Sequence, residues 1–85
     1  MKPVRMYTTP ICPYCVRAKS LLKRKGVAVE EVDVLMDMAA REEMEAKSGG
    51  ARSVPQIFIG DVHVGGSDDL HALEREGSLD PLLDK

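Results

Sequence analysis

The sequence predicts an α/β fold with one four-stranded mixed sheet, built from a strand–helix–strand unit and a later β-hairpin, with helices on both faces. The first observation is an alternating pattern at residues 4–8, an amphipathic pattern at 13–25 and a second strand pattern at 27–34. Such a crossover makes its two strands parallel. The second is a pair of short apolar runs joined by Gly60-Asp61, which is typical of a hairpin turn. A chain of 85 residues allows one domain, residues 1–85.

Periodicity and two prolines define the first strand and the first helix. Residues 4–8 alternate, which puts Met6 on one face of the strand and Tyr7 on the other. Pro10 ends this strand, and Pro13 suits the first turn of a helix, where its missing N–H costs nothing. The buried stripe of that helix is expected to contain Cys15, Ala18, Leu21 and Leu22.

Capping residues define the later helices. Asp37 is expected to be the N-cap of the second helix, and Ser67 the N-cap of the helix that follows the hairpin. Asp68 and Asp69 suit the positive end of that helix. The expected bounds are 38–47 for the second helix, 56–59 and 62–64 for the hairpin strands, 67 onward for the third helix, and 78–83 for a last helical turn.

Composition and charge exclude several classes of function. The chain has 12 Lys and Arg residues against 14 Asp and Glu residues, for a net charge of -2. A nucleic-acid-binding protein needs a basic excess, so no nucleic-acid partner is expected. No apolar run approaches the roughly 18 residues of a membrane span, and residues 1–5 begin no signal peptide. We therefore expect a cytoplasmic protein that binds no membrane, with a monomer as the default state.

The two cysteines carry the clearest chemical signal. Cys12 and Cys15 belong to a Cys-Pro-Tyr-Cys segment at the point where the first strand ends and the first helix begins. A thiolate at a helix N-terminus is stabilised by the helix dipole and by free backbone N–H groups. Cys12 is expected to be exposed there, whereas Cys15 lies one turn further in, shielded but within reach of Cys12. Cys12 would attack an external disulfide, and Cys15 would displace the resulting mixed disulfide.

Three other interpretations of the cysteine pair remain open. A purely structural disulfide would close so small a loop that it would stabilise the fold little. A zinc site needs four ligands, and the two histidines, His63 and His71, lie too far apart in the sequence for the usual spacing, so no metal site is expected. The two cysteines can also lack a function. The strand–helix context favours the redox interpretation.

Four segments stand out in this context: Tyr7-Thr8, Cys12-Pro13-Tyr14-Cys15, Ser53-Val54-Pro55 and Gly65-Gly66-Ser67-Asp68-Asp69. In their order and spacing the sequence resembles the glutaredoxin family, in particular the dithiol glutaredoxins of the short bacterial kind. The resemblance covers nearly the whole chain and implies a thioredoxin-like fold. It further implies a glutathione-dependent thiol–disulfide oxidoreductase that reduces protein disulfides and protein–glutathione mixed disulfides. Glutathione would be the electron donor, no tightly bound cofactor would be needed, and the partners would be glutathione and disulfide-containing or glutathionylated proteins.

The resemblance also implies a glutathione site. Val54–Pro55 would be a cis peptide facing the active-site sulfur, and the Val54 backbone would pair with the cysteinyl part of the tripeptide. The backbone N–H groups of Ser67 and Asp68 would bind the γ-glutamyl carboxylate, and Asp69 would bind the ammonium group. The alternative is that these three residues only cap a helix. The implied binding residues are Tyr14, Val54, Pro55, Gly66, Ser67, Asp68 and Asp69.

One position departs from the family pattern. Glutaredoxins commonly carry a lysine three residues before the first cysteine, and here that residue is Thr9. Acidification of Cys12 would then depend more on the helix N-terminus, on the region of Tyr14, and on Lys19 or Arg52. Glutathione would bind more weakly than usual.

Two functions of other kinds occur among such relatives. An iron–sulfur carrier would hold a cluster between the Cys12 residues of two protomers and two glutathiones. Relatives specialised for this have a glycine after the first cysteine and lack the second, unlike Pro13 and Cys15 here. A protein reduced by thioredoxin reductase and dedicated to ribonucleotide reductase usually carries a tryptophan before the last helix, and this chain has no tryptophan.

The remaining histidines, methionines and glutamates are given no catalytic role. His63 is expected to point outward from its strand, and His71 to lie on the surface of its helix. The methionines are expected to pack in or around the core, and the glutamates to form a solvated helix face; these residues are Met36, Met38, Met44, Glu42, Glu43 and Glu45.

Overall fold

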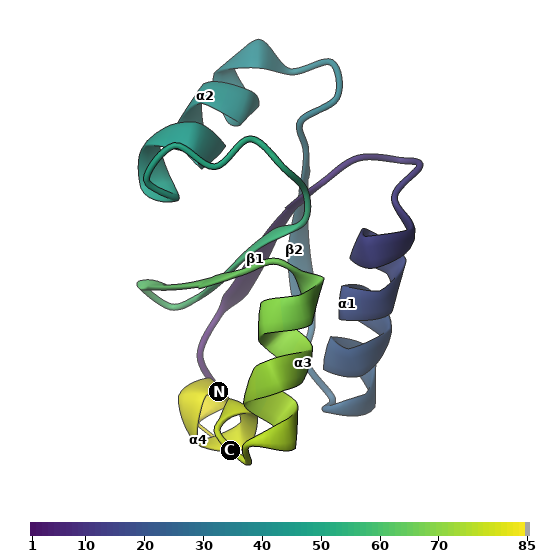
Figure 1. The fold of residues 1–85 in the computed structure, drawn as a ribbon, viewed down its shortest axis with the longest axis vertical. Helices are drawn as coiled ribbons and strands as arrows, with labels where there is room; N and C mark the ends of the chain where they lie inside the picture. The colour runs from purple at the N-terminus through teal and green to yellow at the C-terminus, as the bar shows by residue number, and fades with distance from the viewer. Residues whose placement is uncertain (85) are drawn as a thin grey trace.

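The computed structural model describes residues 1–84 and contains one four-stranded sheet with helices on both faces (Figure 1). The predicted fold class is confirmed. Within the described chain, no helix is both long enough and apolar enough to cross a membrane. In chain order the elements are β1 (Val4–Thr8), α1 (Pro13–Arg24), β2 (Val29–Asp33), α2 (Met38–Lys47), β3 (Gln56–Ile59), β4 (Val62–Gly65), α3 (Ser67–Arg75) and α4 (Leu79–Leu83).

The sheet has the strand order β2-β1-β3-β4. β1 pairs parallel with β2 and antiparallel with β3, and β4 pairs antiparallel with β3 through the turn at Gly60-Asp61. The strand–helix–strand unit and the hairpin are therefore both confirmed. Because β1 is central, the chain that leaves its C-terminal end enters α1 with β2 on one side and β3 on the other. Cys12 lies in this connection.

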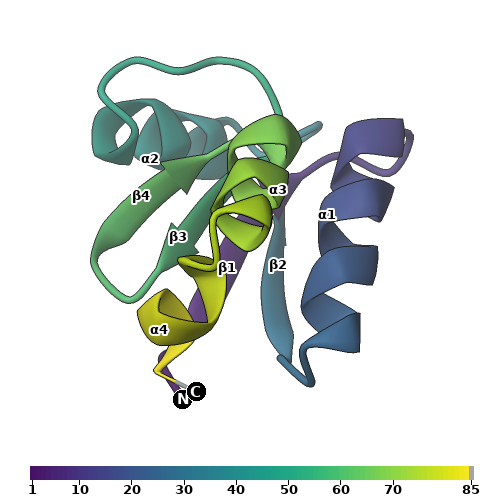
Figure 2. The ribbon, with the colours of Figure 1, turned by 60° about the horizontal axis from the view of Figure 1, so that its bottom comes forward.

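Two helical layers enclose the sheet (Figure 2). α1, α3 and α4 cover one face, where Met6 is fully buried, and α2 covers the other, where Tyr7 is fully buried beside Val34 and Met44. The alternation predicted for β1 is confirmed, because its two faces enter two different clusters. The predicted stripe of α1 is also buried; its residues are Cys15, Ala18, Leu21 and Leu22.

The second strand begins two residues later than predicted. The N–H of Val27 donates to the carbonyl oxygen of Leu22 at 3.0 Å, and the N–H of Gly26 donates to Lys23 at 3.0 Å. These bonds close the C-terminal end of α1, so the N–H of Val27 is not available to the sheet. Val27 is nevertheless buried in the core below α1. The apolar pattern thus predicted correctly that Val27 is buried, but the prediction that Val27 belongs to the second strand is wrong.

The three central methionines differ in their environment. Met44 of α2 is fully buried, as expected, but Met36 and Met38 are 88% and 69% exposed. The expectation that all three pack in or around the core is wrong for these two. They lie at the turn from β2 into α2, where Asp37 caps the helix by accepting the N–H of Ala40 at 3.0 Å.

Glu43 on α2 is more than a solvated charge. Its Oε2 accepts a hydrogen bond from the buried Tyr7 hydroxyl at 2.6 Å and lies 3.6 Å from Arg5 Nη1. The Tyr7 hydroxyl, and the nearby cations of Lys47 and Arg5, hold the pKa of the Glu43 carboxyl below its ordinary value of 4.5. Glu42 and Glu43 are exposed, as expected, whereas Glu45 is half-buried and pairs with an arginine from the following loop.

Replacing Tyr7 by Phe should destabilise the protein more at pH 7 than at pH 3. A carboxyl whose folded-state pKa is depressed contributes stability above its unfolded pKa, and this contribution is lost as the pH falls through the folded value. At pH 3 the Tyr7–Glu43 bond therefore contributes less, and its removal changes less. Urea unfolding of both proteins at the two pH values checks this, with the exposed Tyr14→Phe as control. An equal effect at both pH values would show that the charge of Glu43 does not matter.

The chain ends meet on one side of the molecule. The N–H of Lys2 donates to the carbonyl oxygen of Leu83 in α4 at 3.0 Å. Figures 1 and 2 show both ends of the chain side by side, at the end of the sheet opposite to the β1–α1 connection.

Candidate active site

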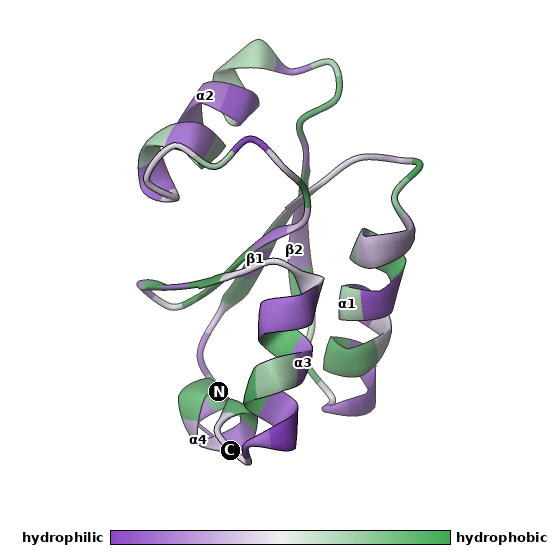
Figure 3. Cartoon of the chain, in the orientation of Figure 1, coloured by the Kyte–Doolittle hydropathy of each residue, from purple (hydrophilic) through white to green (hydrophobic). Residues whose placement is uncertain are grey.

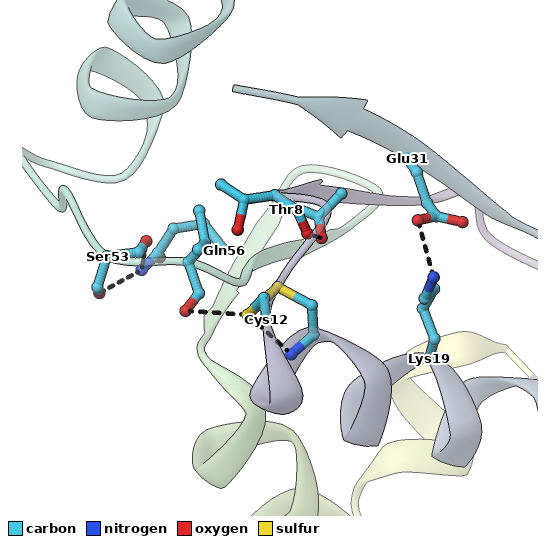
Figure 4. Close-up of a disulfide and its surroundings, with 9 residues drawn as sticks. Thr8, Cys12, Lys19, Glu31, Ser53 and Gln56 are labelled. Carbon is cyan, nitrogen blue, oxygen red and sulfur yellow. Dashed lines mark hydrogen bonds and ion pairs between the residues drawn. A yellow bond between two sulfur atoms is a disulfide. The ribbon is translucent and has the colours of Figure 1, made fainter. Parts of the chain in front are cut away.

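The cysteine pair lies where the first helix begins. Cys12 is the N-cap of α1, with extended backbone (φ -149°, ψ 100°), and its Sγ accepts the N–H of Cys15 at 3.1 Å. Cys12 and Cys15 are joined as a disulfide, with their Cα atoms 5.2 Å apart (Figure 4). After reduction, the same N–H and the helix dipole stabilise negative charge on the Cys12 sulfur. The predicted position of the pair is confirmed.

The two sulfurs differ less in exposure than expected. In the disulfide state Cys12 is 8% exposed and Cys15 is 2% exposed. Cys12 is therefore the more accessible of the two, but the prediction that it is openly exposed is wrong for this oxidised state. The disulfide bond to Cys15 and the carbonyl oxygen of Val54, 3.9 Å from Cys12 Sγ, cover much of the sulfur.

The segment opposite Cys12 is held by a hydrogen-bonded relay. The Val54–Pro55 peptide is cis, as expected, and places the Val54 carbonyl against Cys12. Gln56 Nε2 donates to the carbonyl oxygen of Ser53 at 3.1 Å, and Gln56 Oε1 lies 2.7 Å from His63 Nε2. Because the amide nitrogen is already donating to Ser53, the amide oxygen accepts from the histidine. The relay therefore ties the segment before Pro55 to β3 and β4.

An open cleft of about 470 Å³ lies between this segment and the start of α3. All seven residues of the predicted glutathione site line it, and four of them come from the stretch 66–69. Sequence reasoning missed Gln56 and His63, which also line the cleft. His63 is exposed on its strand, as predicted, yet it stacks on Phe58 with ring centroids 4.8 Å apart and forms one wall of the cleft.

The start of α3 is capped by Asp69, not by Ser67. Gly66 is the N-cap, and Asp69 Oδ2 accepts its N–H at 2.9 Å. The prediction that Ser67 is the N-cap is wrong, because an aspartate at the third helical position can reach back to the cap backbone. Ser67 is instead the buried first residue of the helix. The N–H groups of the first turn have no acceptor within a helix, so those of Ser67 and Asp68 suit an anion in the cleft.

The cations near the site are already paired. Lys19 Nζ lies 3.1 Å from Glu31 Oε1, and Arg52 Nε lies 3.0 Å from Glu45 Oε1. Lys19 and Thr9 line a separate hollow of about 200 Å³ that Cys12 and Cys15 also line. Lys19 is thus on the β2 side of Cys12, away from the cleft, and its charge is shared with a carboxylate.

Comparison with known proteins agrees with this geometry. The family model of glutaredoxin matches residues 4–64. A glutaredoxin of Pseudomonas aeruginosa is 57% identical over 83 residues, which cover 98% of each chain. A solution structure of glutaredoxin from Brucella melitensis is 57% identical, with a TM-score of 0.83 over 98% of this chain and 89% of that one. A crystal structure of a buckwheat glutaredoxin–glutathione complex is 29% identical, with a TM-score of 0.87 over 98% of this chain and 77% of that one.

These likenesses confirm the thioredoxin-like fold and extend over nearly the whole chain. The close Cys12–Cys15 pair at the start of α1 agrees with the thiol–disulfide oxidoreductase chemistry of such proteins. This chain belongs to the glutaredoxin family, among its short bacterial members.

Proposed function

We propose that the protein reduces protein disulfides and protein–glutathione mixed disulfides in the cytoplasm, with glutathione as electron donor and no tightly bound cofactor. The observation that carries the proposal is the position of the redox pair. Cys12 lies at the N-terminus of α1, and the Val54 carbonyl beside it belongs to the wall of a cleft that ends at the N-terminus of α3.

The proposed cycle moves two electrons per turnover. The Cys12 thiolate attacks the glutathione sulfur of a mixed disulfide, a new S–S bond forms, and the protein leaves as a thiolate that takes up a proton. A second glutathione thiolate then attacks this bond, which frees Cys12 and yields glutathione disulfide. With a protein disulfide, Cys15 displaces the substrate from Cys12 and leaves the Cys12–Cys15 disulfide, which two glutathiones reduce.

The cleft offers partners for the cysteinyl and γ-glutamyl parts of glutathione. The backbone of Val54 can pair with the cysteinyl residue, and the N–H groups of Ser67 and Asp68 can bind the γ-glutamyl carboxylate. Asp69 uses Oδ2 for the helix cap, which leaves Oδ1 for the ammonium group. Capping and ligand binding are therefore compatible roles of one carboxylate. The buckwheat complex, a structure of similar fold that contains glutathione, supports glutathione as the ligand.

A coupled assay tests the proposed function directly. The purified protein is given a small glutathione mixed disulfide, glutathione and glutathione reductase, and the consumption of nicotinamide cofactor is followed. We expect turnover that saturates with the mixed disulfide and depends on glutathione. Turnover with a dithiol donor but none with glutathione would contradict the proposal.

Asp69→Asn should raise the KM for a glutathione mixed disulfide about tenfold, roughly the effect of losing one charge-assisted hydrogen bond. Asparagine keeps an oxygen for the N–H of Gly66, so the helix cap remains. The rate at which Cys12 attacks a small neutral disulfide without glutathione should stay unchanged. Asp61→Asn, in the hairpin turn, removes the same charge away from the cleft and serves as the control. An unchanged KM would return Asp69 to a capping role only.

A further inference from the structure

Cys12 lines one of two hollows that have no lining residue in common. The glutathione cleft lies on the side of β3, β4 and α3. The smaller hollow lies on the side of β2 and is lined by Cys12, Cys15 and Val16 on one wall and by Glu31 and Asp33 on the other. Figure 4 shows the disulfide between Ser53 and Gln56 on one side and the Lys19–Glu31 pair on the other. A ligand that fills the cleft therefore leaves the β2 side of Cys12 open.

The hollow on the β2 side continues onto the turn between β2 and α2. Asp33 lines both this hollow and an open depression formed with Met36, Asp37 and Met38. The N–H of Val34 donates to the carbonyl oxygen of Thr8 at 2.9 Å. This bond holds the connection that leads to Cys12 beside the turn that carries the methionines, and both lie at the same end of the sheet (Figure 1). The surface is thus continuous with the redox pair.

This surface gathers most of the large apolar side chains that the described chain leaves exposed. Six of the eight lie in these two connections or in the first turns of α1 and α2, whose ribbons carry hydrophobic colour at this end of the molecule (Figure 3). One of the six, Tyr14, lines the glutathione cleft, which leaves five. Grouped apolar exposure marks an interaction surface, and methionine adapts its shape to different partners. We call this surface the methionine face. Its residues are Ile11, Val16, Leu35, Met36 and Met38.

The charge beside the methionine face is negative. Asp33 Oδ1 accepts the N–H of Leu35 at 2.8 Å, and Asp37 caps α2, but both residues remain exposed. No lysine or arginine lines the depression that they share with the methionines. The face therefore suits a segment that is apolar and positively charged, and glutathione offers neither kind of side chain.

We propose that the methionine face binds the polypeptide part of a protein substrate, and that it favours a reacting cysteine with an apolar residue and a lysine or arginine beside it. The inference rests on the proposed function, because the substrate must deliver its sulfur to Cys12. In this proposal the two sides of the Cys12 sulfur recognise different parts of the substrate. The cleft recognises glutathione, and the methionine face selects the protein.

Peptide–glutathione mixed disulfides test this division. One peptide carries Leu and Lys beside its cysteine, a second of equal length carries Ser and Asp, and cysteine–glutathione serves as the small substrate. We expect the wild-type protein to turn over the Leu–Lys peptide with a kcat/KM several-fold higher than the Ser–Asp peptide. The double variant Met36→Ser/Met38→Ser should lose most of this preference, with unchanged kcat/KM for the small substrate. Both side chains are exposed, so folding is expected to be unaffected, and thermal unfolding checks this.

Two further variants test the position of the apolar side chains and the contribution of the negative charge. Val62→Ser removes an exposed apolar side chain on β4 and should keep the preference. Asp33→Asn/Asp37→Asn keeps the hydrogen-bond acceptors and should lower the preference for Lys at low salt. No preference in the wild-type protein, or the same preference in the methionine variant, would overturn the inference while leaving the proposed function intact. Failure with cysteine–glutathione would overturn the proposed function itself.

Discussion

We expect Cys12→Ser to reduce the turnover of every disulfide substrate to the uncatalysed rate, and Cys15→Ser to lose only the reduction of protein disulfides. Cys12 Sγ is the sulfur that the helix N-terminus stabilises, and Cys15, at 2% exposure, is too shielded to meet an external disulfide. The hydrogen bond to Cys12 Sγ comes from the backbone N–H of Cys15, so the substitution to serine keeps it. In Cys15→Ser a glutathione can still resolve the mixed disulfide on Cys12.

Two assays on the same preparations check these results. One follows release of glutathione from a glutathionylated protein, and the other follows reduction of an intramolecular protein disulfide. Cys15→Ser should keep a rate of the wild-type order in the first assay and fall to background in the second. Similar behaviour of the two variants in both assays would contradict the division of roles between Cys12 and Cys15.

Gly65→Ala should destabilise the protein by roughly 2–4 kcal/mol and should also impair glutathione binding. Gly65 has φ +111°, a conformation that side chains disfavour, and an added Cβ would overlap Asp69 Oδ2 and lie 3.0 Å from Asp69 Cγ. Asp69 would have to move, and the N–H of Gly66 would lose its acceptor. The backbone strain and the lost cap both lower the stability of the protein. The displaced carboxylate should raise the KM for a glutathione mixed disulfide.

Gly49→Ala is the matched control for Gly65→Ala. Gly49 also has a positive φ, +74°, but a Cβ there would meet nothing within 4 Å. It should cost about 1 kcal/mol from backbone strain alone and leave the KM unchanged. Urea unfolding and the coupled assay measure both quantities. If the two variants lost equal stability and kept equal KM values, the contact between Gly65 and Asp69 would have no role in either.

Local patterns predicted most of the fold, because strands, helix stripes and turn residues are properties of short segments. The Met6 and Tyr7 alternation is an example, since period two alone puts them on opposite faces. The partner of Tyr7 was not predictable in this way. Its bond to Glu43 depends on how α2 crosses the sheet, and no pattern within either segment contains that information.

The site likewise contains residues that local motifs predict and residues that they do not. The cysteine pair, the cis proline and the start of α3 carry motifs, and the structure brings them together. Gln56 and His63 carry no motif, but a signal existed. The two-residue turn pairs Ile59 with Val62, so Phe58 faces His63 and Gln56 lies diagonally across on the same face. The cap by Asp69 was missed because serine and aspartate both suit that turn, and only the backbone path decides between them.

The meeting of the two chain ends, far from the β1–α1 connection, has a practical consequence for engineering. A carrier domain or a surface tether attached at Lys2 or beyond Leu83 would leave the whole redox end of the molecule facing outward. The same proximity permits a circular permutant, in which a short linker joins the old ends and new ones open at the Gly60-Asp61 turn. The N–H of Gly60 donates to the carbonyl oxygen of Pro3, so this turn lies beside the N-terminal segment. Such a permutant would therefore leave the redox pair, the cleft and the methionine face unbroken.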